Sequence, residues 1–413
     1  MKQVKHWLKL DLNFNRKKRR LISSFFLCFN DIYEKGKIMR LFHVSDLHLG
    51  IRLMNYDLTE EQNYILNQIV QYIKQYQPDV LIIAGDVFDR STPSANALRQ
   101  YNQWLSDIYE AKEDIQIMVI AGNHDNSSYM DQYKNLLSKE KFYTAGTLPI
   151  QKIKCEDKYG DILFYLMPFV RPSHVKQYLN IDMDQSLSYD KAIHLLLEKE
   201  TIDLNQRNVL VSHQFYLPEE ASLQDIERSD SEIQTVGNID VIYSSALKPF
   251  DYAALGHIHK PMTVKQNIFR YAGSPMAYSI SEQNQNKQIL MVDLLEKGNT
   301  KITSLPLHMK HPVRTIQGYY QNIIQQSSQD YVRIELLDQQ DLNAVDLQEQ
   351  IRFHYPHVLE ILFKNRKWVD MDMEIDNEKI MEPMELILEF LSDYDEEDEK
   401  ILKDILNEER GLL

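Results

Sequence analysis

Cysteine is scarce in this sequence, with only Cys28 and Cys155 among 413 residues. Two cysteines exclude a disulfide framework and a metal site built from thiolates, and they are consistent with the reducing cytoplasm. No apolar run approaches the roughly 20 residues that a transmembrane helix needs, so no membrane partner is expected. The chain also lacks the glycine-rich phosphate loop that ends in lysine, so we do not expect it to hydrolyse ATP itself.

A net positive charge is also missing, because 61 acidic residues outnumber 46 basic ones and the formal net charge is −15. Residues 1–38 carry a net charge of +7 and residues 369–413 a net charge of −13, which leaves −9 for the body between them. An acidic body argues against a protein that binds nucleic acid by bulk charge alone. Clustered carboxylates bind hard metal ions, however, so the charge is compatible with a metal-dependent hydrolase.

The basic segment 1–38 has three interpretations. It resembles the start of a signal peptide, but its apolar stretch is short and no small-residue cleavage site follows. It also resembles a basic nucleic-acid-binding arm. We favour a third hypothesis, a non-native or disordered extension before a natural start at Met39, because a strand-like run begins there and "EKGKIM" can be encoded by a sequence like a bacterial ribosome-binding site. Peptides from residues 1–38 in native protein would refute it.

Five apolar runs end in polar residues that are good metal ligands. Continuous runs of Val, Ile and Leu predict strands buried on both faces. Polar residues just past such strands lie at the carboxyl edge of the sheet, where open α/β folds place their sites. The five endings, in chain order, are Asp46 with His48, Asp86, Asn123 with His124 and Asp125, His213, and His257 with His259.

Two segments between these strands predict helices. Thr59 and Gln62 resemble a capping box at the start of the first helix. The apolar stripes are Ile65, Ile69, Val70 and Ile73 in the first segment, and Ala97, Leu98, Tyr101, Leu105 and Ile108 in the second, after Pro93-Ser94. Alternation of strands and helices indicates an α/β domain built in layers.

Each strand ending has an ordinary structural explanation when it is taken alone. Asp46 and Asp86 are acceptable turn residues, and His213 is acceptable as a hydrogen-bonded core histidine. Five such endings in one chain are difficult to attribute to coincidence, because all supply ligands for metals that accept mixed nitrogen and oxygen donors. The other eight histidines, such as His43 and His174, fall outside these endings, and we interpret them as structural.

The ordered set D-x-H, G-D-x-x-D, G-N-H-D, a single strand-end histidine and G-H-x-H resembles the calcineurin-like metallophosphoesterase superfamily. Within it, "MRLFHVSDLHLG", "GDVFDRSTPS", "AGNHD", "ALGHIHKP" and "RYAGSPMAYSISE" are similar to nuclease subunits of bacterial DNA-processing complexes. The resemblance covers residues 39–310 strongly and implies a layered αββα sandwich with two metal ions. Its departures are the N-terminal segment and the variable "SHQFYLPEE" around His213.

The resemblance also implies a role for each strand-end residue. It implies two Mn²⁺ ions, with Mg²⁺ possible, which activate the attacking water and stabilise the charge on the transferring phosphoryl group. The ligands would be Asp46, His48 and His259 for the first ion, Asn123, His213 and His257 for the second, and Asp86 as a bridge. His124 would stabilise the transition state or protonate the leaving oxygen, Asp125 would orient His124, and Asp89 would give further support.

The C-terminal third changes character. Residues 329–337 predict a strand, residues 344–355 a helix and residues 357–364 a second strand, so 311–368 stands where the family has a capping domain. The acidic tail, residues 369–413, predicts two helices with apolar stripes. A hairpin folded onto its own domain and a docking element for a partner are both compatible with the tail, and we favour docking.

By resemblance, the chain is a Mn²⁺-dependent DNA nuclease subunit with a coiled-coil ATPase as partner. Such complexes contain a nuclease homodimer within a heterotetramer, and act as ATP-dependent 3′–5′ double-strand exonucleases and single-strand endonucleases that open hairpins. They serve DNA replication, recombination and repair in the cytoplasm, at the nucleoid. The alternatives are a phosphatase or small-molecule phosphodiesterase of the same fold, and a scaffold with a vestigial site. Ser91, where protein phosphatases of this superfamily have glycine, argues against a protein phosphatase.

Overall fold

The computed structural model describes residues 37–218, 229–232, 240–265, 267–338 and 344–364. The predicted extension before residue 37 and the predicted tail helices after residue 364 lie outside these residues. The chain divides into one compact unit, residues 1–337 with 342–362, and a second unit, residues 338–341 with 363–413. Only Asp338, Phe363 and Lys364 of the second unit are described, and all other described residues belong to the first.

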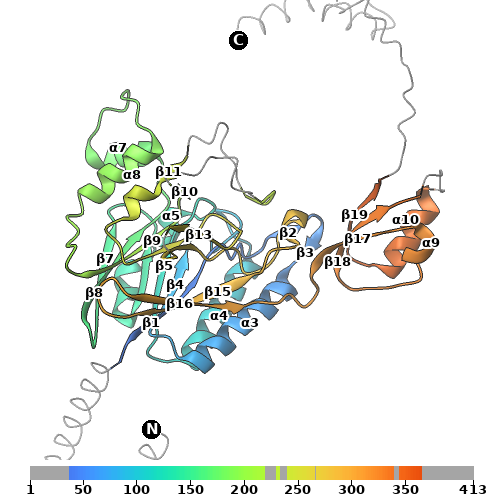
Figure 1. Ribbon diagram of the computed structural model, residues 1–413, viewed down its shortest axis with the longest axis horizontal. Helices are drawn as coiled ribbons and strands as arrows, with labels where there is room; N and C mark the ends of the chain where they lie inside the picture. Colours follow the sequence, from blue (N-terminus) through green and yellow to red (C-terminus); the bar gives the residue numbers. More distant parts are fainter. Residues whose placement is uncertain (1–36, 219–228, 233–239, 266, 339–343, 365–413) are drawn as a thin grey trace, which may run out of the picture. The chain divides into compact units, whose positions relative to one another are not determined.

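Two six-stranded sheets form the centre of the first unit (Figure 1). The first sheet contains, in spatial order, β16 (Thr300–Pro306), β15 (Gln288–Leu294), β1 (Met39–Val44), β4 (Val80–Ala84), β5 (Gln116–Ile120) and β6 (Phe142–Ala145). The second contains β13 (Met262–Lys265), β14 (Phe269–Tyr271), β12 (Tyr252–Leu255), β9 (Arg207–Ser212), β8 (Gly160–Met167) and β7 (Gln151–Asp157). β1, β4 and β5 run parallel, as do β9 and β12, so their carboxyl ends meet at common edges.

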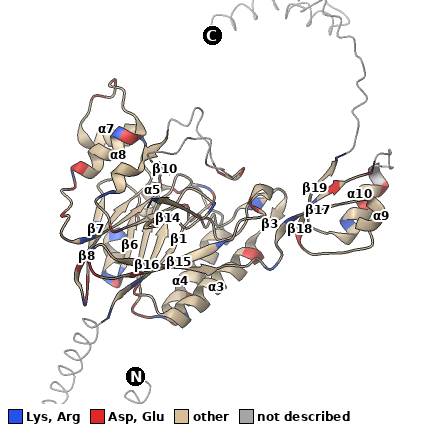
Figure 2. Cartoon of the chain, viewed as in Figure 1, with Lys and Arg blue, Asp and Glu red and all other residues tan. Residues whose placement is uncertain are grey.

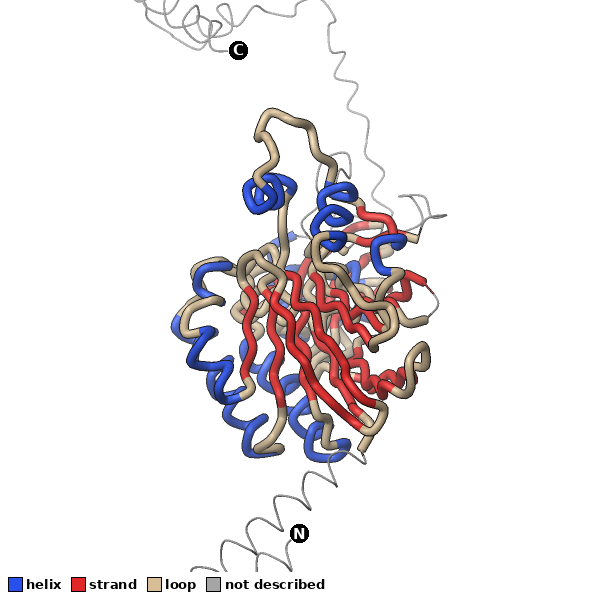
Figure 3. Tube along the Cα trace, turned by 90° about the vertical axis from the view of Figure 1, so that its left-hand side faces the viewer, coloured by secondary structure: helices blue, strands red, loops and turns tan. Residues whose placement is uncertain are grey.

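The strands are buried on both faces, as their continuous apolar runs predict. In β4 all five residues are buried: Ile82 packs between the two sheets, while Leu81 and Ile83 pack against helices. The helices over the first sheet are α3 (Thr59–Tyr76) and α4 (Ala95–Ala111), and those over the second are α7 (Pro172–Leu179) and α8 (Tyr189–Glu198). Figure 3 shows strands lying side by side with helices flanking them. The predicted αββα layers are confirmed.

The start of α3 differs from the prediction, whereas the packing of α4 agrees with it. The cap of α3 is Leu58 without a side-chain bond, and Gln62 is instead turned toward the loop after β1, so the predicted capping box is wrong. In α4 the side chain of Ser94 does cap the helix. The predicted stripe of α4 packs on the core, with Ala97 and Ile108 fully buried and with Leu98, Tyr101 and Leu105 half-buried against it. Trp104, which the prediction did not include, is also buried.

The predicted strand–helix–strand pattern of the C-terminal third is present. A three-stranded sheet contains β17 (Val313–Gly318), β18 (Tyr331–Leu336) and β19 (Val358–Phe363), and α10 (Ala344–His354) precedes β19. The shorter elements are β2 (Arg52–Leu53), β3 (Tyr56–Asp57), α5 (Ser127–Met130), α6 (Lys134–Leu137), η1 (Ser138–Glu140), β10 (Tyr216–Leu217), β11 (Ile242–Tyr243), η4 (Ser244–Leu247), η5 (Ile280–Glu282) and α9 (Tyr320–Ile323). Within the described residues, no helix has the length and apolar character to cross a membrane.

Candidate metal centre

The strand-end residues converge at one place because the parallel strands deliver their carboxyl ends to the same edge. Each of the nine predicted site residues follows its strand by one to five positions. They are Asp46 and His48 after β1, Asp86 after β4, Asn123, His124 and Asp125 after β5, His213 after β9, and His257 and His259 after β12. Three groups of these side chains have ligand atoms within 4.8 Å of one another: Asp46, His48 and His259; Asp46, Asp86 and His213; and His48, Asp86 and His124.

Four of these residues have a positive φ angle, a backbone conformation that residues other than glycine rarely adopt. The φ angles are 54° at Asp46, 41° at His48, 50° at Asp86 and 98° at His257. Left-handed backbone at non-glycine residues is uncommon and gathers at functional sites. Here the loops after β1 and β4 are joined by backbone bonds: Asp46 N donates to Gly85 O at 3.0 Å, and His48 N donates to Asp86 O at 2.9 Å. These bonds hold the ligand residues in their strained positions.

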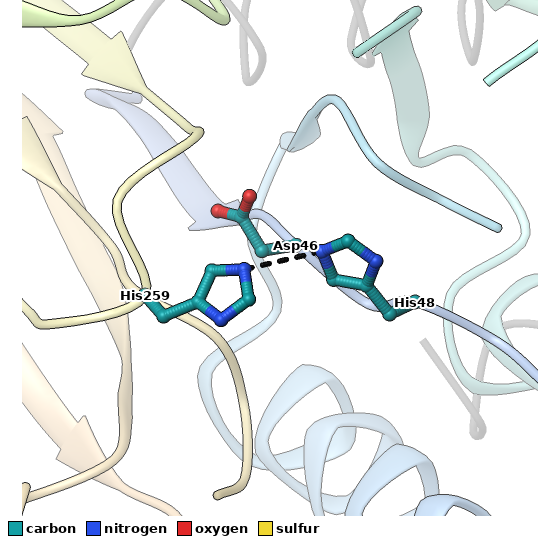
Figure 4. A group of neighbouring side chains, drawn as sticks. All are labelled: Asp46, His48 and His259. Carbon is teal, nitrogen blue, oxygen red and sulfur yellow. Dashed lines mark hydrogen bonds between the residues drawn. The ribbon is translucent and has the colours of Figure 1, made fainter. Parts of the chain in front are cut away.

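The first predicted metal group is Asp46, His48 and His259 (Figure 4). The two ring nitrogens His48 Nε2 and His259 Nε2 face each other at 3.2 Å, and all three side chains are buried. Burial lowers the pKa of His48 well below its usual value, so its ring is kept neutral. A neutral imidazole presents a lone pair, so this group has the donors that a transition-metal ion requires.

The second predicted group is Asn123, His213 and His257. Oδ1 of Asn123 lies 3.1 Å from His213 Nε2 and 3.0 Å from His257 Nδ1. Asp86 lies between the two groups, since its Oδ2 is 3.2 Å from His213 Nε2 and 3.5 Å from His48 Nε2. One carboxylate oxygen within reach of a histidine from each group is the arrangement that a bridging ligand requires. The donor set therefore fits two divalent cations.

The electrostatics of the centre favour positive charge. Burial opposes the ionised form of Asp86, but the ring of His213, with smaller contributions from His48 and His124, holds its pKa below the usual range. Burial likewise opposes protonation of His213, yet Asp86 and Asp46 together raise the pKa of its ring to about 9. The carboxylates thus hold a proton where a cation would otherwise bind, and cation binding would displace that proton.

His124 lies at the edge of the centre and is half-exposed. Its backbone N–H donates to Asp86 Oδ1 at 2.9 Å, and its Nδ1 lies 2.8 Å from the carbonyl oxygen of Asp89. Because a carbonyl only accepts, Nδ1 carries the hydrogen, and Nε2 is the nitrogen available to a substrate. Asp89 also has a carboxylate oxygen 3.8 Å from His48 Nδ1, so it contacts both histidines, in keeping with its predicted supporting role.

The prediction that Asp125 orients the ring of His124 is wrong. Its carboxylate accepts three backbone N–H groups instead, from Val87 at 3.2 Å, Phe88 at 3.0 Å and Gly122 at 2.9 Å. Burial and the nearby Asp86 raise the pKa of Asp125 to about 6 despite these bonds. Asp125 therefore fixes the loop after β4 against the loop after β5, and the Asp89 carbonyl orients His124.

Two consecutive buried polar residues of α3 hold segments that are distant in the sequence, and one of them, Gln62, supports the centre, although the sequence predicted only a helix-capping role for it. Gln62 donates to His48 O at 2.9 Å and accepts from Gly50 N at 3.2 Å, so it holds the loop that carries Asp46 and His48. Glu61 accepts from Lys310 N at 3.0 Å and lies 2.6 Å from Nδ1 of His311, at the entrance to β17. Buried polar residues in a helix stripe that is otherwise apolar were the available signal.

The chain is similar to several known proteins. The calcineurin-like phosphoesterase family matches residues 39–261. The SbcD subunit of the SbcCD nuclease from Staphylococcus saprophyticus is 31% identical over 294 residues, which cover 70% of this chain and 74% of the relative. The protein of the same name from Staphylococcus epidermidis is 28% identical over 330 residues, with 78% and 84% covered. A solved dimetal phosphatase from Danio rerio is 11% identical with a TM-score of 0.36, covering 66% of this chain and 99% of that one.

The chain belongs to the calcineurin-like phosphoesterases and, within them, to the family of the SbcD nucleases. It is therefore a metal-dependent phosphodiester hydrolase. The match to the phosphoesterase family, over residues 39–261, includes the whole set of strand endings, from Asp46 to His259.

Proposed function

We propose that this chain is the Mn²⁺-dependent DNA nuclease subunit of an SbcCD-type complex, with Mg²⁺ as an alternative ion. Asp46, His48 and His259 would hold the first ion and Asn123, His213 and His257 the second, with Asp86 between them. The observation that carries the proposal is the position of Asp86 Oδ2, within 3.5 Å of a histidine from each group. The names of its curated relatives support nucleic acid as the substrate.

The ions, when bound, supply the Lewis acidity that activates water and neutralises charge on the phosphoryl group. The chain's own contribution is placement and proton transfer. His124 presents Nε2 to the scissile phosphate while the Asp89 carbonyl holds Nδ1. A protonated His124 can stabilise the developing charge or give its proton to the leaving oxygen. Asp125 holds together the two loops that carry Asp86 and His124.

An assay with four substrates tests this function. Duplex DNA, hairpin DNA, a phosphopeptide and a small phosphodiester are incubated with the full chain and Mn²⁺. We expect DNA cleavage to exceed hydrolysis of the other two, and preferential cleavage of the phosphopeptide or the small diester would establish the phosphatase or phosphodiesterase alternative. His124→Ala should lower DNA cleavage by about 100-fold or more with Mn²⁺ binding retained. His174→Ala, which removes an exposed histidine away from the strand endings, is the matched control.

We further propose that the chain works with an SbcC-like coiled-coil ATPase, which supplies ATP hydrolysis. In this proposal a nuclease homodimer lies within a heterotetramer, 311–368 caps the nuclease domain 39–310 and helps select DNA, and 369–413 docks the partner. Basic and acidic residues are interspersed along the described elements (Figure 2), so much of the DNA affinity is assigned to the partner. The complex would cut duplex ends 3′–5′, cleave single strands and open hairpins at the nucleoid in the cytoplasm.

Truncation after Lys367 tests the docking role of the tail. The shortened chain should keep Mn²⁺-dependent cleavage but should no longer co-purify with the ATPase. Undiminished co-purification would assign the tail to its own domain instead.

A further inference from the structure

The ring of His259 forms a hydrogen bond with a residue that lies outside the strand endings. Oγ of Ser231 lies 2.8 Å from His259 Nδ1, and the same hydroxyl donates to Glu282 Oε1 at 2.5 Å. Ser231 lies in the short described segment 229–232, and Glu282 ends η5. Two consecutive hydrogen bonds thus connect the candidate ligand to a buried carboxylate.

The direction of these two hydrogen bonds determines the tautomer of His259. A serine hydroxyl has one hydrogen, and a carboxylate only accepts, so the Ser231 hydrogen is used on Glu282. Nδ1 of His259 must then donate its hydrogen to Ser231 Oγ. In a neutral ring the lone pair consequently lies on Nε2, the nitrogen that faces His48 at 3.2 Å.

The same surroundings fix the main chain of His259. Its N–H donates to Glu232 Oε1 at 2.8 Å, and its carbonyl accepts from Lys287 Nζ at 3.1 Å. Lys287 also donates to Glu282 Oε2 at 2.5 Å, and both side chains are buried, so the charge of the carboxylate is paired. An unpaired buried carboxylate would be costly, and the pairing allows Glu282 to remain an acceptor.

The second metal group is held by different means. His213 Nδ1 lies 2.7 Å from the carbonyl oxygen of Ala84, at the end of β4. A backbone carbonyl fixes this ring without any contribution from Ser231 or Glu282. Loss of the Ser231 hydroxyl should therefore affect one ion and leave the other.

We propose that Ser231 and Glu282 are positioning residues that preset the Nε2 lone pair of His259 for the first metal ion. This inference rests on the proposed two-metal site and extends it to two residues outside the strand endings. It also gives a role to the glutamate and to two of the three serines of "GSPMAYSISE", since Ser274 and Ser279 donate to Glu282 at 3.1 Å each. Partners that hold a ligating histidine commonly change metal affinity by about 10–100-fold.

Mn²⁺ binding to the full chain, followed by the electron paramagnetic resonance signal of free Mn²⁺, tests the proposal. The wild type should bind two ions per chain. Ser231→Ala should bind one of them about 10–100-fold more weakly and the other with unchanged affinity. Ser231→Thr, which restores the hydroxyl, should restore the affinity. Ser231 is half-buried, and equal unfolding midpoints in EDTA would show that the Ala variant is folded.

Ser245→Ala is the matched control, because Ser245 Oγ contacts a histidine outside the site, His194, at 3.4 Å. It should bind both ions like the wild type. Wild-type affinity in Ser231→Ala, equal weakening of both ions, or failure of Ser231→Thr to restore binding would each overturn the positioning role while leaving the two-metal site intact. Absence of Mn²⁺ binding by the wild type would overturn the proposed function as well.

Discussion

Replacing His43 with glutamine should reduce the loss in the free energy of unfolding that mild acid causes. His43 lies on β1 between the two sheets with no exposed surface, and its Nδ1 is 2.8 Å from the Tyr252 hydroxyl of the other sheet. Burial lowers the pKa of this imidazole from 6.5 to about 3. The folded chain therefore keeps the ring neutral at a pH where the unfolded chain protonates it.

The sign and size of the effect follow from this difference. The folded pKa lies below the unfolded one, so the stabilising contribution is complete above about pH 6.5 and is lost as the pH falls. Between about pH 7.5 and pH 5, the unfolded ring takes up nearly one proton that the folded ring does not accept. This proton lowers the free energy of unfolding by about 2 kcal/mol, a value that hardly changes for any folded pKa below about 4. His43→Gln should lose about 2 kcal/mol less over the same interval.

Urea unfolding of the full chain in EDTA at both pH values provides the measurement. Tryptophan fluorescence is a suitable signal, since Trp104 packs in the core between α4 and the first sheet. His308→Gln removes an exposed histidine and is the matched control for the loss of one imidazole. If wild type and His43→Gln lost the same stability between the two pH values, the neutral buried state of His43 would be refuted.

Two further predictions concern the metal centre. Asp86→Ala should abolish DNA cleavage and weaken binding of both Mn²⁺ ions together, because Asp86 lies between the two groups; unchanged affinity for either ion in a Mn²⁺ titration would contradict the bridging role. Gly122→Ala should lower Mn²⁺ affinity and activity more than tenfold, since a Cβ at this position would lie 2.1 Å from Asp86 Oδ1. Gly318→Ala, where the nearest atom would be 3.5 Å away, is its control, and equal Mn²⁺ affinity in the two variants would show that the loop accommodates the methyl group.

The sequence predicted the layers and the strand endings because both depend on local patterns. A run such as Val80–Ala84 is buried on both faces in any α/β sheet, and the residue after it must lie at the sheet edge. Parallel pairing of β1 with β4 and β5 then brings Asp46, Asp86 and Asn123 together without further information. For this reason the strand endings could be predicted as candidate ligands from the sequence, whereas the assignment of each ligand to an ion came from the resemblance to the metallophosphoesterase superfamily.

The supporting residues could not be predicted because their partners are distant in the chain. Gln62 is a normal first-turn helix residue in sequence, and only tertiary packing turns its amide toward His48. Ser231 has no pattern around it, yet it contacts His259 across 28 positions. For Asp125 the sequence suggested a contact that is absent. Its position next to His124 suggested that the two side chains interact, but its carboxylate accepts hydrogen bonds from backbone N–H groups instead.

The strained backbone of the ligand loops connects the fold to the chemistry. Left-handed backbone at a non-glycine residue costs about 1–3 kcal/mol, so four such residues together cost an amount comparable to a domain's net stability. The fold tolerates this because the two six-stranded sheets and the bonds from Asp46 to Gly85 and from His48 to Asp86 fix the loops. Loops without this strain would be more stable, but the ligand side chains would then have to move into place when the ions bind. The strain is consistent with a centre whose ligands are placed by the fold before the metals arrive.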